Sequence, residues 1–142
     1  LVACGKYTPY QNELKEFAEV NGIGHRVHFL NSVAMGDLPA IYQMASVCVY
    51  ISLFEGFGIP ILEALNSGVP VITSEGGVFP ETGGDACLYV EQHDIPATVE
   101  ALKSALYDTR QREGMIARGY AYAQHFREER IAGQLHDLYH SL

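Results

Sequence analysis

Two glutamates flank a glycine-containing turn in the middle of the chain, in the run Glu55-Gly-Phe-Gly-Ile-Pro-Ile-Leu-Glu63. The turn follows an apolar run and precedes a stretch of helical character that begins near Pro60. Gly56 and Gly58 allow unusual backbone angles and a close approach to a ligand. Free N–H groups at the start of a helix can hydrogen-bond an anion. The segment therefore has the parts of an anion-binding site placed between two carboxylates.

Each glutamate also has a structural explanation. We expect Glu63 near the first helical turn, where a carboxylate complements the helix dipole, so a structural and a ligand-binding role both stay open for it. Glu55 directly follows an apolar strand and precedes Gly-Phe-Gly, which should direct its carboxylate toward a crevice. A G-x-G pattern alone is common in turns. Its value here comes from its position between two carboxylates that are eight residues apart.

The elements that must position this turn alternate along the chain. Apolar runs rich in Val and Ile predict strands at 1–4, 27–30, 47–51, 69–73 and 86–90. Helical spacing predicts helices that end at Gly22, span Leu38 to Ala45, run from Pro60 to before Gly68, and fill the chain after residue 90. This order predicts an α/β fold, with a Rossmann-like parallel sheet, helices on both faces and C-terminal helices. Ligands of such sheets bind beyond the carboxyl ends of the strands, where the turn sits.

Composition and charge exclude several classes of function. The net charge of −8 argues against a nucleic-acid partner, and no Lys or Arg stands between Arg26 and Lys103. The three cysteines, Cys4, Cys48 and Cys87, are odd in number and far apart, which indicates reduced thiols in a reducing compartment. The histidines lack ligand spacing with any cysteine, so we expect no metal site. No apolar run approaches the roughly 20 residues of a membrane-spanning helix.

The run from Glu55 to Ala64, followed by Gly68-Val-Pro-Val-Ile, resembles the E-x7-E segment of the group 1 (family 4) retaining glycosyltransferases. Further segments resemble the same family in the same order: Leu1–Gly5, Arg26–Leu30, Leu38–Ala45 and Pro80–Ala86. The resemblance implies one half of a two-domain GT-B enzyme. We expect residues 1–142 to form a single C-terminal donor-binding domain, without the N-terminal acceptor domain and the first part of this domain. The start of the chain on an apolar strand without Met fits that expectation.

The resemblance also implies roles for individual residues. Glu63 would bind the ribose hydroxyls of a nucleotide, since a carboxylate accepts two hydroxyl donors of a cis-diol. Glu55, the expected catalytic residue, would contact the donor sugar. The implied donor-binding set is Gly5, Leu30, Asn31, Glu55, Gly56, Phe57, Gly58, Ile59 and Glu63. The sequence departs from the family at Asn31, where many relatives have Gly, and at Val78, where a small residue is common.

We therefore interpret the chain as part of a glycosyltransferase that moves a sugar from a nucleotide-diphosphate donor to an acceptor hydroxyl with retention. The chain would bind the donor and would be inactive alone. No cofactor and no metal is expected, and the acceptor, a glycan or another hydroxyl compound, would bind through the N-terminal domain. We expect a cytoplasmic protein, or a peripheral one at the inner membrane face through parts outside this chain.

Two alternatives remain open. A nucleotide-sugar 2-epimerase shares the GT-B architecture, although the Glu-Gly-Phe-Gly run with its second Glu favours the transferase. A non-enzymatic α/β module of receiver type would need an Asp at a strand end, where this chain has Cys4-Gly5-Lys6. Other candidates have simpler explanations. We expect His25 and His28 at the surface, Glu81 in a structural role at the crevice rim, and most tyrosines in the core or on amphipathic surfaces.

Overall fold

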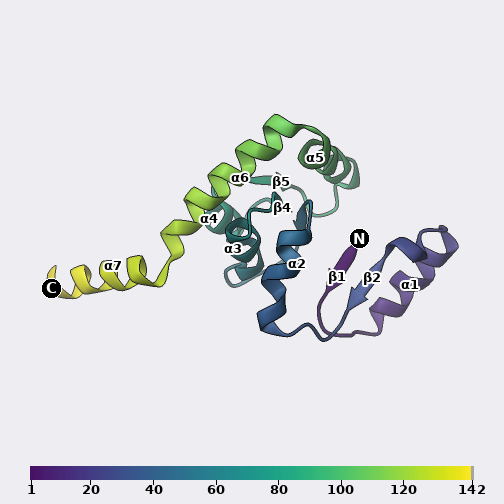
Figure 1. Cartoon of the computed structure of the whole chain (residues 1–142), viewed down its shortest axis with the longest axis horizontal. Coiled ribbons are helices and arrows are strands. Elements are labelled where there is room, and N and C mark those ends of the chain that lie inside the picture. The colour runs from purple at the N-terminus through teal and green to yellow at the C-terminus, as the bar shows by residue number, and fades with distance from the viewer. Residues whose placement is uncertain (142) are drawn as a thin grey trace. The chain divides into compact units, whose positions relative to one another are not determined.

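The computed structural model describes residues 1–141. The chain divides into two compact units, Leu1–Leu38 and Pro39–Leu142, and each unit is described on its own. Figure 1 follows the chain through the elements of both units.

The first unit is a strand–helix–strand crossover. Strand β1 (Val2–Cys4) pairs in parallel with β2 (His28–Leu30). Helix α1 (Tyr10–Val20) and the short 3-10 helix η1 (Gly24–Arg26) connect them, and a second 3-10 helix, η2 (Met35–Asp37), follows. Gly22 has a φ of 69° just after α1, a left-handed conformation that commonly ends a helix. The predicted helix end and the predicted parallel pairing are confirmed.

The second unit is a three-stranded parallel sheet with its helices. Strand β4 (Val71–Ser74) lies between β3 (Cys48–Tyr50) and β5 (Cys87–Val90). The helices before β5 are α2 (Leu38–Met44), α3 (Ile59–Asn66) and α4 (Phe79–Gly83). The helices after it are α5 (Ile95–Tyr107), α6 (Thr109–Ala123), the 3-10 helix η3 (Gln124–Phe126) and α7 (Glu128–Ser141). The predicted strands and helices are thus present. Within residues 1–141 the strands form two parallel sheets, one in each unit.

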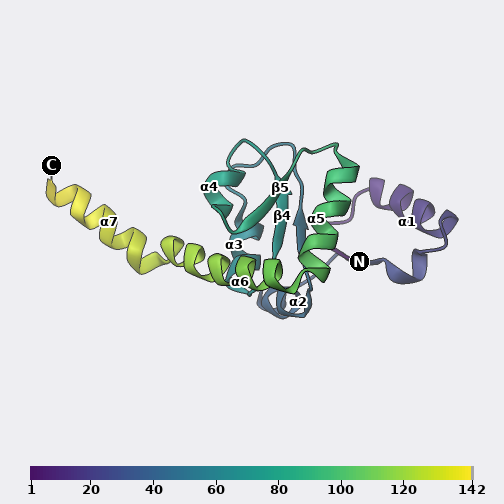
Figure 2. The same ribbon diagram turned by 90° about the horizontal axis from the view of Figure 1, so that it is seen from above.

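Helices cover both faces of the three-stranded sheet, as the continuous apolar strands predicted. All four residues of β4 are buried. Val71 packs in a cluster with Ile61 and Leu65 of α3, whereas Ile72 packs with Ala105 of α5. Figure 2 shows α3 and α5 on opposite sides of β4 and β5.

The register of the sheet places three polar side chains in one row. Tyr50 pairs with Thr73, and Thr73 pairs with Tyr89. They follow Val71 by alternation along the strands, so the row lies on the face that α3 covers. This row is near the carboxyl ends of the strands, where a ligand of a parallel sheet is expected.

Local sequence signals explain where the later helices start. The Asp94 carboxylate accepts a hydrogen bond from the Ala97 N–H at 2.8 Å, and the Asp108 carboxylate accepts one from the Gln111 N–H at 3.0 Å. Side chains 128–141 of α7 are all exposed, including the predicted stripe of Ile131, Leu135 and Leu138. Its fourth member, Leu142, lies outside the described residues. None of the helices within residues 1–141 is long and apolar enough to cross a membrane.

Candidate functional site

The loop that follows β3 is fixed to the ends of the other two strands, at the carboxyl end of the sheet. The Ser52 N–H donates to the Ser74 hydroxyl oxygen at 3.0 Å, and that hydroxyl donates to the Ser52 carbonyl at 2.8 Å. The Gln92 side chain, just after β5, donates to the same carbonyl at 3.0 Å. The ends of three strands are therefore tied together at the start of the segment that carries Glu55.

Glu55 is hydrogen-bonded by a phenol from the sheet. The Tyr50 hydroxyl donates to Glu55 Oε1 at 2.6 Å. Burial, followed by this hydrogen bond, raises the pKa of Tyr50 to about 12, so the phenol keeps its proton near neutral pH. Glu55 is only partly buried. One carboxylate oxygen is thus held by the protein while the group stays accessible.

Glu63 has a similar arrangement on α3. The Tyr42 hydroxyl, on α2, donates to Glu63 Oε2 at 3.0 Å. Glu63 lies in the second turn of α3 and not in the first, so the placement expected from the sequence was wrong. The helix-dipole explanation weakens, because that effect is confined to the first turn. Both glutamates of the pattern are therefore partly buried and bound to tyrosine phenols.

The turn between the glutamates needs glycine at one of its two positions. Gly58 has a φ of 89° and precedes α3. A Cβ there would lie 3.2 Å from Ile61 Cδ1, so both conformation and space favour glycine. Gly56, in contrast, does not have a positive φ, and a Cβ there would meet nothing within 4 Å. The expectation of unusual backbone angles is therefore confirmed for Gly58 and wrong for Gly56.

A buried threonine supports the same turn from α4. The Thr82 hydroxyl lies within hydrogen-bonding distance of the Phe57 carbonyl and, at 3.1 Å, of the Val78 carbonyl. Thr82 is fully buried. The Gly-Phe-Gly turn is thus held by a side chain from the segment that precedes β5.

The start of α3 offers fewer free N–H groups than the sequence suggested. Pro60 has no N–H, and the Ile61 N–H donates to the Gly58 carbonyl at 2.9 Å. Two of the first three helical residues therefore have no donor left for an anion. An anion at this turn would rely more on the N–H groups of the loop itself.

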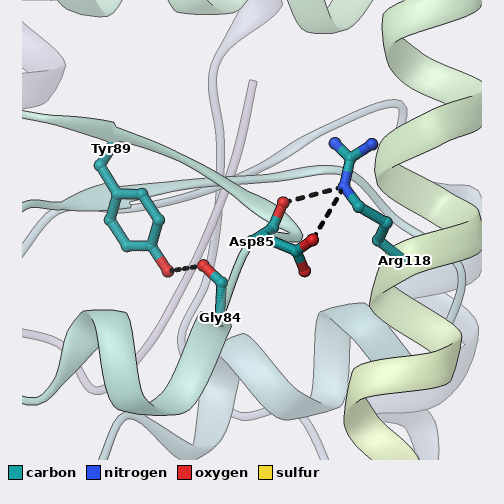
Figure 3. Close-up of polar contacts among 4 residues, drawn as sticks. All are labelled: Gly84, Asp85, Tyr89 and Arg118. Atoms are coloured by element: carbon teal, nitrogen blue, oxygen red, sulfur yellow. Dashed lines mark hydrogen bonds and ion pairs between the residues drawn. The ribbon is translucent and has the colours of Figure 1, made fainter.

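The segment from Pro80 to Ala86 has structural contacts. The Tyr89 hydroxyl donates to the Gly84 carbonyl at 2.7 Å, and the Arg118 guanidinium points toward Asp85 (Figure 3). Arg118 Nε donates to the Asp85 carbonyl at 2.9 Å, with the Asp85 carboxylate at 4.0 Å. The carbonyl of Glu81 accepts the Tyr122 hydroxyl at 2.7 Å, while its side chain is exposed. These bonds fasten the turn before β5 to α6, through Arg118 and Tyr122, and to β5 itself, through Tyr89.

The remaining predicted site residues lie in the first unit. Gly5 follows β1, and its N–H donates to the carbonyl of Leu30, at the end of β2, at 3.2 Å. Asn31 comes next, and all three residues are exposed. The structure thus brings Gly5, Leu30 and Asn31 together at the carboxyl ends of β1 and β2. His25 and His28 are exposed, as expected.

Sequence reasoning missed the residues that hold the turn: Tyr42, Tyr50, Ser74, Thr82 and Gln92. Tyr50 and Ser74 end apolar strands, which is a usable signal because polar side chains at that edge face the ligand side of a parallel sheet. The tyrosines were assigned to core and surface packing, and their hydroxyl partners could not be read from spacing. Within residues 1–141, no group of three or more His, Cys, Asp or Glu could hold a metal ion, and no disulfide joins the cysteines.

The comparisons with known proteins identify the family and the fold. The model of the family "Glycosyl transferases group 1" matches residues 1–122. The O-antigen chain mannosyltransferase B of Escherichia coli is 40% identical over 113 residues, which are 80% of this chain and 30% of that protein. The chain spans about 30% of the length of the curated relatives it matches first.

Solved structures share the fold. Sucrose-phosphate synthase (tll1590) from Thermosynechococcus elongatus superposes with a TM-score of 0.86 at 28% identity, covering 99% of this chain and 38% of that one. Anabaena Alr3699/HepE, solved in complex with UDP-glucose, has a TM-score of 0.85 at 23% identity, covering 99% of this chain and 40% of that one. At this identity the second likeness shows the fold alone.

Proposed function

The chain belongs to the group 1 glycosyltransferases, and from this premise we propose that it binds the nucleotide-sugar donor of a retaining sugar transfer. The observation that carries the proposal is the pair of carboxylates at the carboxyl end of the sheet. Glu55 and Glu63 flank a turn that contains Gly58 in the left-handed conformation, and each is bound through one oxygen to a tyrosine phenol. Such preorganised acceptors suit a ligand rich in hydroxyl groups.

We assign the two carboxylates to different parts of the donor. Glu63, on the helix, binds the ribose hydroxyls of the nucleotide, and Glu55, in the loop, contacts the transferred sugar and is the catalytic residue. The backbone of Gly56, Phe57, Gly58 and Ile59 meets the diphosphate and the sugar, since N–H groups of a loop bind anions well. For Gly5, Leu30 and Asn31, which lie together at the carboxyl ends of β1 and β2, we propose contacts with a nucleotide base.

The charge distribution limits how tightly a free diphosphate can bind. No Lys or Arg occurs between Arg26 and Lys103, so the segment that carries the turn has no cation of its own, and we expect its backbone N–H groups to provide most of its contacts with a diphosphate. We therefore expect a millimolar rather than a micromolar dissociation constant for a free nucleotide diphosphate, a gap of roughly 4 kcal/mol.

Calorimetry on the 142-residue chain tests the proposal. UDP-glucose, GDP-mannose and ADP-glucose are titrated, each beside its diphosphate, with EDTA present because we expect no metal in the reaction. We expect one nucleotide-sugar to bind more tightly than its own diphosphate, and Glu55→Gln to abolish that difference. If none of the three pairs binds at millimolar concentration, the donor role is refuted.

The activity of the whole protein is a further proposal. It transfers the sugar to a hydroxyl acceptor with retention of the anomeric configuration, in the cytoplasm or at the inner membrane face. The thiols of Cys4, Cys48 and Cys87 fit a reducing compartment. Proton NMR of the product's anomeric signal tests retention, since an inverted anomer would contradict it.

A further inference from the structure

We propose that Tyr50 is a positioning residue that sets Glu55 for the sugar of the donor. The inference rests on the proposed function, because it assumes that Glu55 contacts the transferred sugar. It extends that function by naming the group that holds the Glu55 carboxylate in one orientation.

The loop itself does little to fix the Glu55 side chain. Phe54, the preceding residue, is 87% exposed, and Gly56, the following one, has no neighbour within 4 Å of its would-be Cβ. In the part of the chain that the structure describes, Tyr50 provides the side-chain hydrogen bond to Glu55, at 2.6 Å. Removing the phenol would let the carboxylate rotate into solvent.

Tyr50 is well suited to hold a carboxylate in place. It lies on β3, and its carbonyl accepts the Thr73 hydroxyl at 2.8 Å, so its backbone is tied to the central strand. Its phenol donates to Glu55 Oε1, which leaves Oε2 with both lone pairs for a ligand hydroxyl. A group oriented in advance loses less entropy when the ligand binds.

The chain contains a matched control for this residue. Tyr89 stands two strands away in the same row, with Thr73 between the two tyrosines. Its hydroxyl donates to the Gly84 carbonyl at 2.7 Å, so we assign it no contact with the ligand. Tyr89→Phe therefore removes one phenol hydroxyl, of a partly buried tyrosine, from the same face of the sheet, and the lost hydrogen bond is to a carbonyl rather than to a carboxylate.

The test separates binding of the sugar from binding of the nucleotide. Dissociation constants of UDP and UDP-glucose, or of the better of the other two pairs, are measured for the wild-type chain, Tyr50→Phe, Tyr89→Phe and Glu55→Gln. We expect Tyr50→Phe to reduce the preference for the nucleotide-sugar about tenfold, the scale of one hydrogen bond to a charged group, with the diphosphate constant unchanged. Tyr89→Phe should leave the preference unchanged, because its hydroxyl holds the Gly84 carbonyl behind the turn and any shift of the turn acts on UDP and UDP-glucose alike.

The double variant Tyr50→Phe with Glu55→Gln should show no loss beyond that of Glu55→Gln alone, because the two residues act as one unit. The inference is overturned if Tyr50→Phe keeps the full preference while Glu55→Gln loses it; the proposed function then still stands. It is also overturned if Tyr50→Phe weakens UDP and UDP-glucose equally, together with a lower thermal midpoint, since its role would then be structural. A wild-type chain without any preference for the nucleotide-sugar would refute the proposed function as well.

Discussion

The hydroxyl of Thr82 is hydrogen-bonded to the backbone carbonyl of Phe57, which joins α4 to the middle of the turn between the two glutamates. Thr82 is fully buried, so this contact is shielded from water. The Pro80–Ala86 segment, which the sequence indicated only through its resemblance to the family, therefore contacts the turn directly. Its Thr82 hydroxyl holds the backbone of the Gly-Phe-Gly turn against α4.

Thr82→Val should destabilise the chain by about 1–3 kcal/mol, because it removes the fully buried hydroxyl that donates to the Phe57 carbonyl. Urea denaturation measures this change through the unfolding midpoint. Thr82→Ser keeps the hydroxyl and is the matched control, with only the cost of one lost methyl group, about 1 kcal/mol. Equal stability of the valine variant and the wild type would show that the contact contributes nothing to the fold.

Glu63→Gln should weaken binding of a nucleotide diphosphate by about 1–3 kcal/mol, since a charged acceptor for the ribose hydroxyls becomes neutral. Fold stability should change much less, because the glutamine amide oxygen can still accept the Tyr42 hydroxyl that Glu63 binds at 3.0 Å. Calorimetry and thermal unfolding on the same sample separate the two effects.

Tyr42→Phe extends this test. It should weaken UDP and UDP-glucose by the same factor, because Tyr42 orients the carboxylate for the nucleotide, whereas Tyr50→Phe acts on the sugar alone. A variant of Glu63 that binds the diphosphate as well as the wild type would exclude Glu63 from the nucleotide site.

Much of this site could be predicted from the sequence, and the limit has a physical cause. The alternation of apolar runs and helical stretches placed Glu55 in the loop after β3 and Glu63 on the helix that follows, because local periodicity determines strand and helix type. The tyrosines could not be assigned in this way. The Tyr50–Glu55 and Tyr42–Glu63 bonds depend on side-chain direction across separate elements, which residue spacing along the chain does not encode.

The stability of the chain should fall as the pH rises above about 9, in part because of Cys87. Burial raises the pKa of this thiol from 9.0 to about 12. The folded state therefore holds the proton more tightly than the unfolded state does, so the contribution is complete below about pH 9 and is lost as the pH rises toward 12. Cys87→Ala should flatten this decline, in urea midpoints measured with a reductant from about pH 8 to about pH 11.

The exposed Cys4 supplies the control for that experiment, because Cys4→Ala changes a thiol that solvent already reaches. The decline should not vanish completely in Cys87→Ala, since burial also raises the pKa of Tyr50 to about 12. An unchanged pH profile in Cys87→Ala would mean that this thiol is not protected from water in the folded state.

The 142-residue chain should not transfer sugar by itself. It spans 30% of the length of the E. coli mannosyltransferase that it resembles, and the resemblance assigns the acceptor to the other domain of the GT-B fold. Transfer requires an acceptor hydroxyl next to the anomeric carbon and exclusion of water, and such positioning accounts for several kcal/mol of the barrier. Phe54, next to Glu55 in the sequence, is 87% exposed and Ile59 is 61% exposed, so residues of this chain do not enclose the apolar side chains of the turn. The purified chain is incubated with the nucleotide-sugars and a panel of hydroxyl acceptors, with the E. coli mannosyltransferase as the positive control, and products are followed by mass spectrometry. We expect no glycosylated product above background. Turnover on the order of 1 per second, typical of enzymes, would show that residues 1–142 already contain a complete active site.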